Sequence, residues 1–330
     1  MKKTYFKASG MLAAAIFGIT TILGGVQLTS CSADGGSSSD ESSEQESQNG
    51  GGGSSENGSG SADGTTKNIS ITHAAGWLES AYVTWFPARE TTIDGYNVYV
   101  KETGGEYTKL DDMLVRAYSN TAGGTTIDYY RADALGLKAG TYQMKVVGTA
   151  SGVEASGVYA ESKVITVEAH DRSGFAFHAS AKQTPGAYTA DGTLKNGARV
   201  LYITKDTAKT VTADIITNNK GKVEKITGIQ AILDAMQKGY DTTPTSVRFI
   251  GLIEASDMDR FSSSAEGLQI KGKSAYSPMP ITIEGVGDDA VFHGFGVLCR
   301  TSSYVEIRNL GFMAFKDDGI SLDTDNYYTW

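Results

Sequence analysis

The sequence predicts an all-β protein in which an antiparallel sandwich precedes the stacked coils of a parallel β-helix. Between residues 67 and 170, short β-forming runs alternate apolar and polar residues and are separated by turns such as Gly104-Gly105. Between residues 281 and 330, more short β-rich runs follow with Gly, Asn and Asp turns and no long helical pattern. Such coils cannot bury an apolar face alone, so they stack into one continuous core.

Composition limits the classes of function. The chain has 38 acidic and 29 basic residues and a net charge of −9, which argues against nucleic-acid binding because that normally needs a basic face. A polyanionic substrate stays possible, since a bound cation reverses the local charge. The two cysteines, Cys31 and Cys299, supply neither a CxxC metal site nor a disulfide framework. Cys299 lies in an apolar run, which predicts a buried thiol.

Residues 1–30 have the pattern of an export signal. Three lysines (Lys2, Lys3 and Lys7) precede an apolar run from residue 11 to residue 26, which is shorter than the ~20 residues of a membrane helix. The run ends in Leu28-Thr29-Ser30-Cys31, which resembles a bacterial lipobox, and an ordinary signal peptide with an incidental Cys is the weaker alternative. The resemblance implies lipidation of Cys31 and membrane contact only through that lipid. By resemblance to Gram-negative lipoproteins, Ser32 rather than Asp after the Cys implies an outer-membrane lipoprotein of the cell envelope, on the cell surface or secreted.

Residues 31–66 form a second segment, rich in Gly, Ser and acidic residues. No Lys or Arg occurs between Lys7 and Lys67. A segment of this composition buries little surface, so the sequence predicts a disordered tether.

Residues 67–170 resemble a fibronectin type III domain. The strands are expected at residues 69–72, 81–85, 95–101, 126–129, 142–150 and 164–168. Trp85 falls where that fold keeps a core Trp, and the run from Leu137 to Tyr142 resembles its tyrosine corner. Trp85, Tyr82, Tyr96 and Tyr99 fit core and cross-strand packing better than a sugar-stacking platform.

Residues 171–330 open with a stretch from Gly186 to Thr204 that looks like the start of a pectate lyase β-helix. One amphipathic helix follows, because Ile229, Ile232, Leu233 and Met236 recur at helical spacing. A capping box of Thr227 and Gln230 is expected to begin this helix and Gly239 to end it. Such a helix would cover the open end of the coil core.

The last fifty residues carry the strongest resemblance to the pectate lyase family. Motifs similar to those of this family are found in ITIEG (residues 281–285), in VEIRNL (305–310) and in Asp318-Gly319-Ile320. The resemblance implies a right-handed parallel β-helix, with residues 171–330 as its N-terminal coils. It also implies cleavage of polygalacturonate, a pectic polysaccharide, by calcium-dependent β-elimination, and it assigns Asp318 as a Ca²⁺ ligand. The alternative for Asp317, Asp318, Asp323 and Asp325 is a role as turn residues.

No catalytic residue is assigned, because the family's catalytic Arg belongs to later coils. Four arginines (Arg248, Arg260, Arg300 and Arg308) do not occupy its position, and His178 and His293 fit structural roles. We therefore expect this chain to be C-terminally truncated, inactive alone and monomeric. The rival hypotheses are a non-catalytic glycan-binding surface lipoprotein, to which Tyr327, Tyr328 and Trp330 would contribute, and a structural rod.

Overall fold

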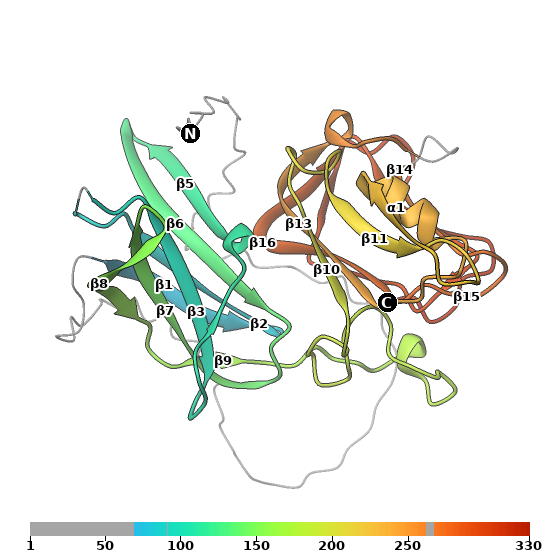
Figure 1. Ribbon diagram of the computed structural model, residues 1–330, viewed down its shortest axis with the longest axis horizontal. Coiled ribbons are helices and arrows are strands. Elements are labelled where there is room, and N and C mark those ends of the chain that lie inside the picture. The colour runs from blue at the N-terminus through green and yellow to red at the C-terminus, as the bar shows by residue number, and fades with distance from the viewer. Residues whose placement is uncertain (1–68, 91, 262–266) are drawn as a thin grey trace, which may run out of the picture. The chain divides into compact units, whose positions relative to one another are not determined.

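The computed structural model describes residues 69–90, 92–261 and 267–330 (Figure 1). These residues are mostly β-strand in several sheets, which confirms the all-β prediction. They belong to one compact unit, Gly58–Trp330. The signal segment with Cys31 and the tether lie outside the described residues. Within the described part of the chain, no helix is long and apolar enough to cross a membrane.

Two antiparallel sheets make up the first half of the described chain. One has the order β1 (Ser70–Trp77), β2 (Ser80–Phe86), β6 (Thr125–Leu135) and β5 (Val115–Ala122). The other has the order β4 (Thr108–Lys109), β3 (Gly95–Glu102), β7 (Gly140–Ala150) and β8 (Val153–Glu161), with β9 (Ile165–Val167) also on β7. A short 3₁₀ turn, η1 (Asp112–Leu114), precedes β5.

The two sheets share a core around Trp85, whose side chain is 0% exposed. Its ring lies 5.3 Å from that of Tyr96 and 5.6 Å from that of Tyr130. Burial excludes Trp85 from stacking on a sugar in this fold. The hydroxyl of Tyr142 donates a hydrogen bond to the carbonyl of Lys138 at 3.0 Å, which is the contact of a tyrosine corner.

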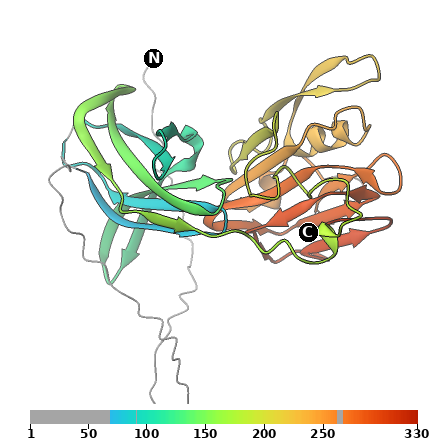
Figure 2. The same ribbon diagram turned by 90° about the horizontal axis from the view of Figure 1, so that it is seen from below.

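Three sets of parallel strands make up the second half. One set joins β10 (Arg199–Ile203), β13 (Thr245–Glu254), β16 (Ile281–His293) and β19 (Glu306–Arg308), and β20 (Gly311–Met313) also pairs with β16. The second joins β14 (Gly267–Lys271), β17 (Gly296–Arg300) and β21 (Ile320–Asp323), and the third joins β15 (Ser277–Pro278) and β18 (Ser302–Ser303). The chain passes through the three sets in turn and then returns to the first (Figure 2).

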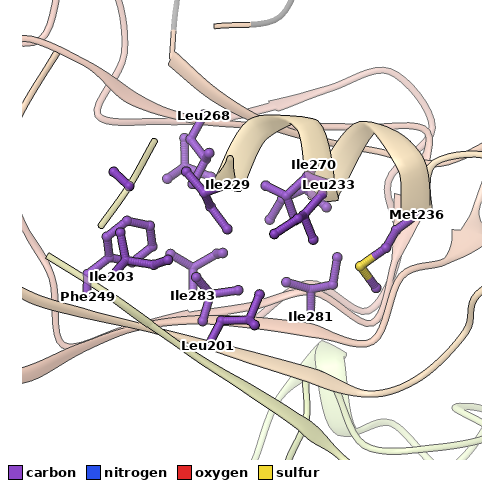
Figure 3. Packing of buried hydrophobic residues seen from close by; sticks show 14 of the residues in the cluster. Leu201, Ile203, Ile229, Leu233, Met236, Phe249, Leu268, Ile270, Ile281 and Ile283 are labelled. Carbon is purple, nitrogen blue, oxygen red and sulfur yellow. The ribbon is translucent and has the colours of Figure 1, made fainter. Parts of the chain in front are cut away.

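This winding aligns apolar side chains in columns. Leu201, Val247, Ile283 and Ile307 occupy matched positions on β10, β13, β16 and β19. Figure 3 shows side chains from several strands and from the helix meeting in one cluster. Cys299 is fully buried in it, as predicted, and burial raises the pKa of its thiol to about 12.

The helix α1 (Ile229–Met236) forms where the apolar spacing predicted it, and Gly239 turns the chain after its end with a φ of +72°. The expected capping box is wrong, because Gly228 is the N-cap and has no side chain. Asp259 supplies the cap instead and accepts the N–H groups of Gln230 and Ala231 at 3.0 and 3.2 Å. The Gln230 amide pairs with both backbone groups of Gln269, so α1 covers the free edge of β14.

Candidate functional site

Asp318 lies on the turn between β20 and β21, directly before the Gly319-Ile320 pair that opens the strand. Its side chain is exposed and forms no hydrogen bond or ion pair with any other described residue. The carboxylate is therefore free to meet a ligand from solvent. Gly296 on the preceding coil keeps this turn close, because a Cβ there would overlap the Asp318 carbonyl.

The neighbouring acids do not gather around Asp318. Asp323 forms an ion pair with Arg300, its register partner on β17, and Asp325 offers its backbone carbonyl to the N–H of Tyr276 at 3.1 Å. Asp317 is exposed on the same turn as Asp318. Calcium needs six to eight oxygen ligands. Among residues 69–90, 92–261 and 267–330, no group of three or more Asp, Glu, His or Cys residues could hold a metal, so these residues do not by themselves form a calcium site.

A second group of polar and charged residues lies on β10, β13, β16 and β19. Tyr202, Arg248, Glu284 and Arg308 occupy matched positions across these strands, and we call them the buried ladder. Arg248 is 4% exposed and Glu284 is 1% exposed. Each ladder residue follows a core-facing residue, so strand alternation turns it to the other face of the sheet.

Glu284 is the centre of the ladder. Its carboxylate accepts the Arg248 Nε–H at 3.0 Å and the Arg308 Nη2–H at 2.9 Å. The hydroxyls of Ser246 and Tyr188 also donate to it. Arg248 in turn donates to the hydroxyls of Tyr202 and Tyr188 at 3.1 and 3.0 Å. The polar groups of the ladder are thus satisfied inside the protein.

Neighbouring arginines determine whether the buried carboxylates at the ladder are protonated. Burial alone would raise the pKa of Glu284, but Arg308 and Arg248 outweigh it and lower this pKa to about 2. Glu79 lies against Arg172 and Arg308, which together hold its pKa below the ordinary value against the opposing effect of burial. The buried carboxylates Glu79 and Glu284 therefore stay ionised at neutral pH, and neither is a proton donor there.

Further ion pairs connect the first half of the chain to the second. Arg116 on β5 contacts Asp133 and donates to Asp289 at 2.9 Å. Arg131 on β6 contacts Asp288 at 2.7 Å and Asp133 at 2.9 Å. The Tyr118 hydroxyl donates to Asp289 at 2.8 Å. These contacts join β5 and β6 to the Asp288–Asp289 segment of β16, so this group acts as a structural link.

A cavity of about 600 Å³ lies between β3, β6 and the ladder. Its lining includes the apolar Leu110, Leu114 and Leu137 and the charged Lys101 and Glu102. Arg248 lines it, but the hydrogen bonds described above occupy the Arg248 guanidinium. The cavity thus presents no unpaired buried charge from the ladder to a ligand.

Sequence reasoning singled out some residues that the structure uses differently. Trp330 packs its ring 5.2 Å from His170 and 5.3 Å from Phe177, so it belongs to a packed cluster. Tyr327 is 46% exposed and Tyr328 is half-buried. The buried ladder was missed altogether, because the charged positions that form it are far apart in the sequence. Their common signal is a residue that can donate or accept a hydrogen bond directly after the core position in each β-run, charged in three of the four.

No protein-family model matches this chain, and a comparison with curated proteins finds no match.

Proposed function

We propose that this chain is a pectate lyase-like protein of the bacterial cell envelope, in which a fibronectin type III-like sandwich precedes the coils of a right-handed parallel β-helix. The observation that carries the proposal is the repeated passage of the chain through three sets of parallel strands. These parallel strands include the segments whose sequence motifs resemble those of the pectate lyase family. Lipidation of Cys31 and export to the outer membrane belong to the same proposal.

The proposed substrate is polygalacturonate, and the proposed reaction is β-elimination at the uronate ring. In that chemistry a cation neutralises the substrate carboxylate, so that the proton on the adjacent carbon becomes more acidic. Calcium dependence is part of the proposal, with Asp318 as the one described carboxylate assigned to it. We derive no step through the ion, because the described residues do not form a calcium site by themselves.

The test is native gel electrophoresis of the full chain through polygalacturonate, with calcium or with a chelator. We expect calcium to increase the retention of the wild type. In the Asp318→Ala variant this calcium-dependent increase should be smaller by about tenfold or more. Asp317→Ala is the matched control, because it removes an exposed carboxylate from the same turn. Release of unsaturated uronate, measured by absorbance, tests the elimination itself.

Each result decides between the hypotheses. Equal losses of calcium-dependent retention in the Asp317→Ala and Asp318→Ala variants would show a general effect of negative charge and no specific role of Asp318. Release of unsaturated product would exclude a non-catalytic glycan-binding lipoprotein and would contradict the expectation that this chain is inactive alone. Absence of any retention by polygalacturonate would contradict the proposed substrate.

A further inference from the structure

Exposed lysines gather beside the C-terminal end of α1. Two antiparallel strands, β11 (Thr212–Ile216) and β12 (Val223–Thr227), form a hairpin that lies next to this helix (Figure 1). The hairpin, the residues that follow α1 and the turn after β14 together carry five exposed lysines. We call them the lysine corner: Lys220, Lys222, Lys225, Lys238 and Lys273.

The hairpin supplies three of these lysines. Lys220 and Lys222 lie in its turn, where the side-chain oxygen of Asn218 accepts both of their backbone N–H groups, at 2.9 and 3.1 Å. Lys225 lies on β12 directly opposite Asp214 of β11, and strand alternation turns both to solvent. The three lysines thus project from one small element whose turn is fixed by hydrogen bonds.

The other two lysines come from segments beside the hairpin. A hydrogen bond of 2.5 Å from Lys222 is the largest cause of the lowered pKa of Glu224, and Lys238 also contributes to it. The Lys238 ammonium is therefore within electrostatic reach of β12. The Lys273 ammonium lies 5.4 Å from the ring centre of Tyr240, which is two positions after Lys238. These contacts bring both lysines to the hairpin end of α1.

The lysine corner carries an excess of positive charge. Of its five lysines, only Lys222 forms an ion pair within the described residues. The hairpin has two acids, Asp214 and Glu224, so five positive charges face two negative ones. The nearby Asp241 is buried and paired with Arg199 at 2.9 Å, so it does not neutralise the lysines. The corner is thus basic on a chain whose net charge is −9.

The same chain contains a run of opposite charge. Residues 40–46 read DESSEQE, which is four acids in seven residues, and no Lys or Arg occurs between Lys7 and Lys67. This acidic run lies outside the described residues. It has no apolar side chain, so a contact with the lysine corner would depend on charge and would weaken as salt is added.

The length of chain between the acidic run and the fold allows them to meet. Residues 47–68 separate the run from Ile69, the first described residue. A chain of this length spans roughly 75 Å when extended, whereas a folded unit of this size has a radius of gyration of about 20 Å. A partner on so short a connection has an effective concentration of about 1 mM. Even a contact with a Kd of about 1 mM is then occupied half of the time.

We propose that the lysine corner is a docking surface for the acidic run, residues 40–46, of the same chain. The docking does not depend on the proposed polysaccharide substrate. It would draw in residues 31–66, the tether predicted from the sequence. Ionic strength would then control the distance between Cys31 and the folded part of the chain.

The experiment measures how fast each lysine of the full chain is acetylated by the N-hydroxysuccinimide ester of acetic acid, with peptide mass spectrometry as the readout. At about 20 mM salt, where the Debye length is roughly 20 Å, we expect the lysine corner to react about twofold more slowly than at about 500 mM salt. A four-acid variant should remove this protection. It combines Asp40→Asn, Glu41→Gln, Glu44→Gln and Glu46→Gln.

Matched controls locate the effect. A three-acid variant (Asp34→Asn, Glu56→Gln and Asp63→Asn) removes scattered acids and should keep most of the protection. Lys163 and Lys316 are exposed on other segments, and their acetylation should be the same in every variant. Carbodiimide cross-linking of mixed ordinary and ¹⁵N-labelled chains shows whether the run and the corner belong to one copy. The substitutions lie outside residues 69–330, so they leave the described fold unchanged.

Equal acetylation of the lysine corner in the wild type and the four-acid variant would overturn this docking and leave the polygalacturonate proposal intact. An equal loss of protection in the three-acid variant would overturn the choice of residues 40–46. Cross-links found only between copies would contradict a contact within one chain. Protection that appears only with vesicles of anionic phospholipid, equally in both forms, would assign the corner to a membrane surface instead.

Discussion

Two columns of charged residues on the coils differ mainly in what covers them. Arg248, Glu284 and Arg308 are stacked in register across β13, β16 and β19, and Lys271, Arg300 and Asp323 are stacked in the same way across β14, β17 and β21. The side chains of Arg248 and Glu284 are 5% and 1% exposed, whereas those of Arg300 and Asp323 are 31% and 40% exposed. The first column is part of the fold, and the second faces solvent.

The difference shows that the same local pattern has opposite energetic consequences. Removal of one partner from a buried pair leaves an uncompensated charge in a poorly solvated place. Removal of one partner from an exposed pair returns the other to water at little cost. Substitutions in the two columns test this contrast.

The largest effect is expected for Arg248→Ala, which removes a buried partner from Glu284. We expect the free energy of unfolding to fall by about 3–5 kcal/mol, as is typical of a broken buried pair. Urea denaturation of the full chain measures it. Arg300→Ala is the matched control on the exposed column and should cost less than about 1 kcal/mol. Similar losses in the two variants would contradict the contrast.

The second largest effect is a loss of stability at low pH through Glu284 in the buried column. The pKa of Glu284 is lowered from 4.5 to about 2 in the folded protein, so its contribution to stability is present above 4.5 and is lost as pH falls toward 2. The shift corresponds to about 3 kcal/mol. Urea denaturation between pH 6 and 2 (roughly the window set by these values) measures the slope.

Glu284→Gln provides the comparison for this pH dependence. The variant lacks the titrating carboxylate, so its stability should fall less steeply over the same range of pH. Identical slopes in the wild type and the variant would show that other acids dominate acid unfolding.

A smaller loss is expected for Gly296→Ala. The added methyl group would overlap the Asp318 carbonyl, so the turn before β21 must move. Such overpacking costs about 1–3 kcal/mol. Gly319→Ala is the control, because its Cβ would meet only side-chain atoms, of Phe312 and Phe315, at 3.3–3.5 Å. Equal thermal stabilities of the Gly296→Ala variant and the wild type would show that the turn adapts freely.

The smallest effect on stability is expected for Asp318→Ala. The side chain is exposed and forms no hydrogen bond or ion pair within the described residues, so the free energy of unfolding should change by less than about 0.5 kcal/mol. The same variant should lose calcium-dependent retention by polygalacturonate. A large loss of stability would instead assign Asp318 to the fold and remove the basis for its role as a ligand.

Local patterns were enough to locate most of the elements. Apolar spacing located α1, and the alternation in residues 96–100 and 142–146 located β3 and β7. Strands β5 and β8 were missed, because many of their residues are exposed and polar and thus show little alternation. The cap of α1 was wrong because Asp259, which supplies it, is distant in the sequence.

Some features of the candidate site were also predictable from the sequence, and others were not. The turn position of Asp318 and the apolar surroundings of Cys299 follow from neighbouring residues, and the structure has both. The ring contact between Tyr276 and Tyr327 could not be predicted in this way, because the two residues come from different coils and meet only when the coils stack.

The positions of most β-runs, of the helix and of the turn after it follow from the sequence, because they depend on residues within a few positions of one another. Which charges are covered depends instead on how the coils stack. Glu284 is buried because parallel register places it between Arg248 and Arg308 and because Tyr188 and Glu79 arrive from other segments. Burial depends on tertiary contacts between residues that are distant in the sequence, and no local pattern specifies those contacts.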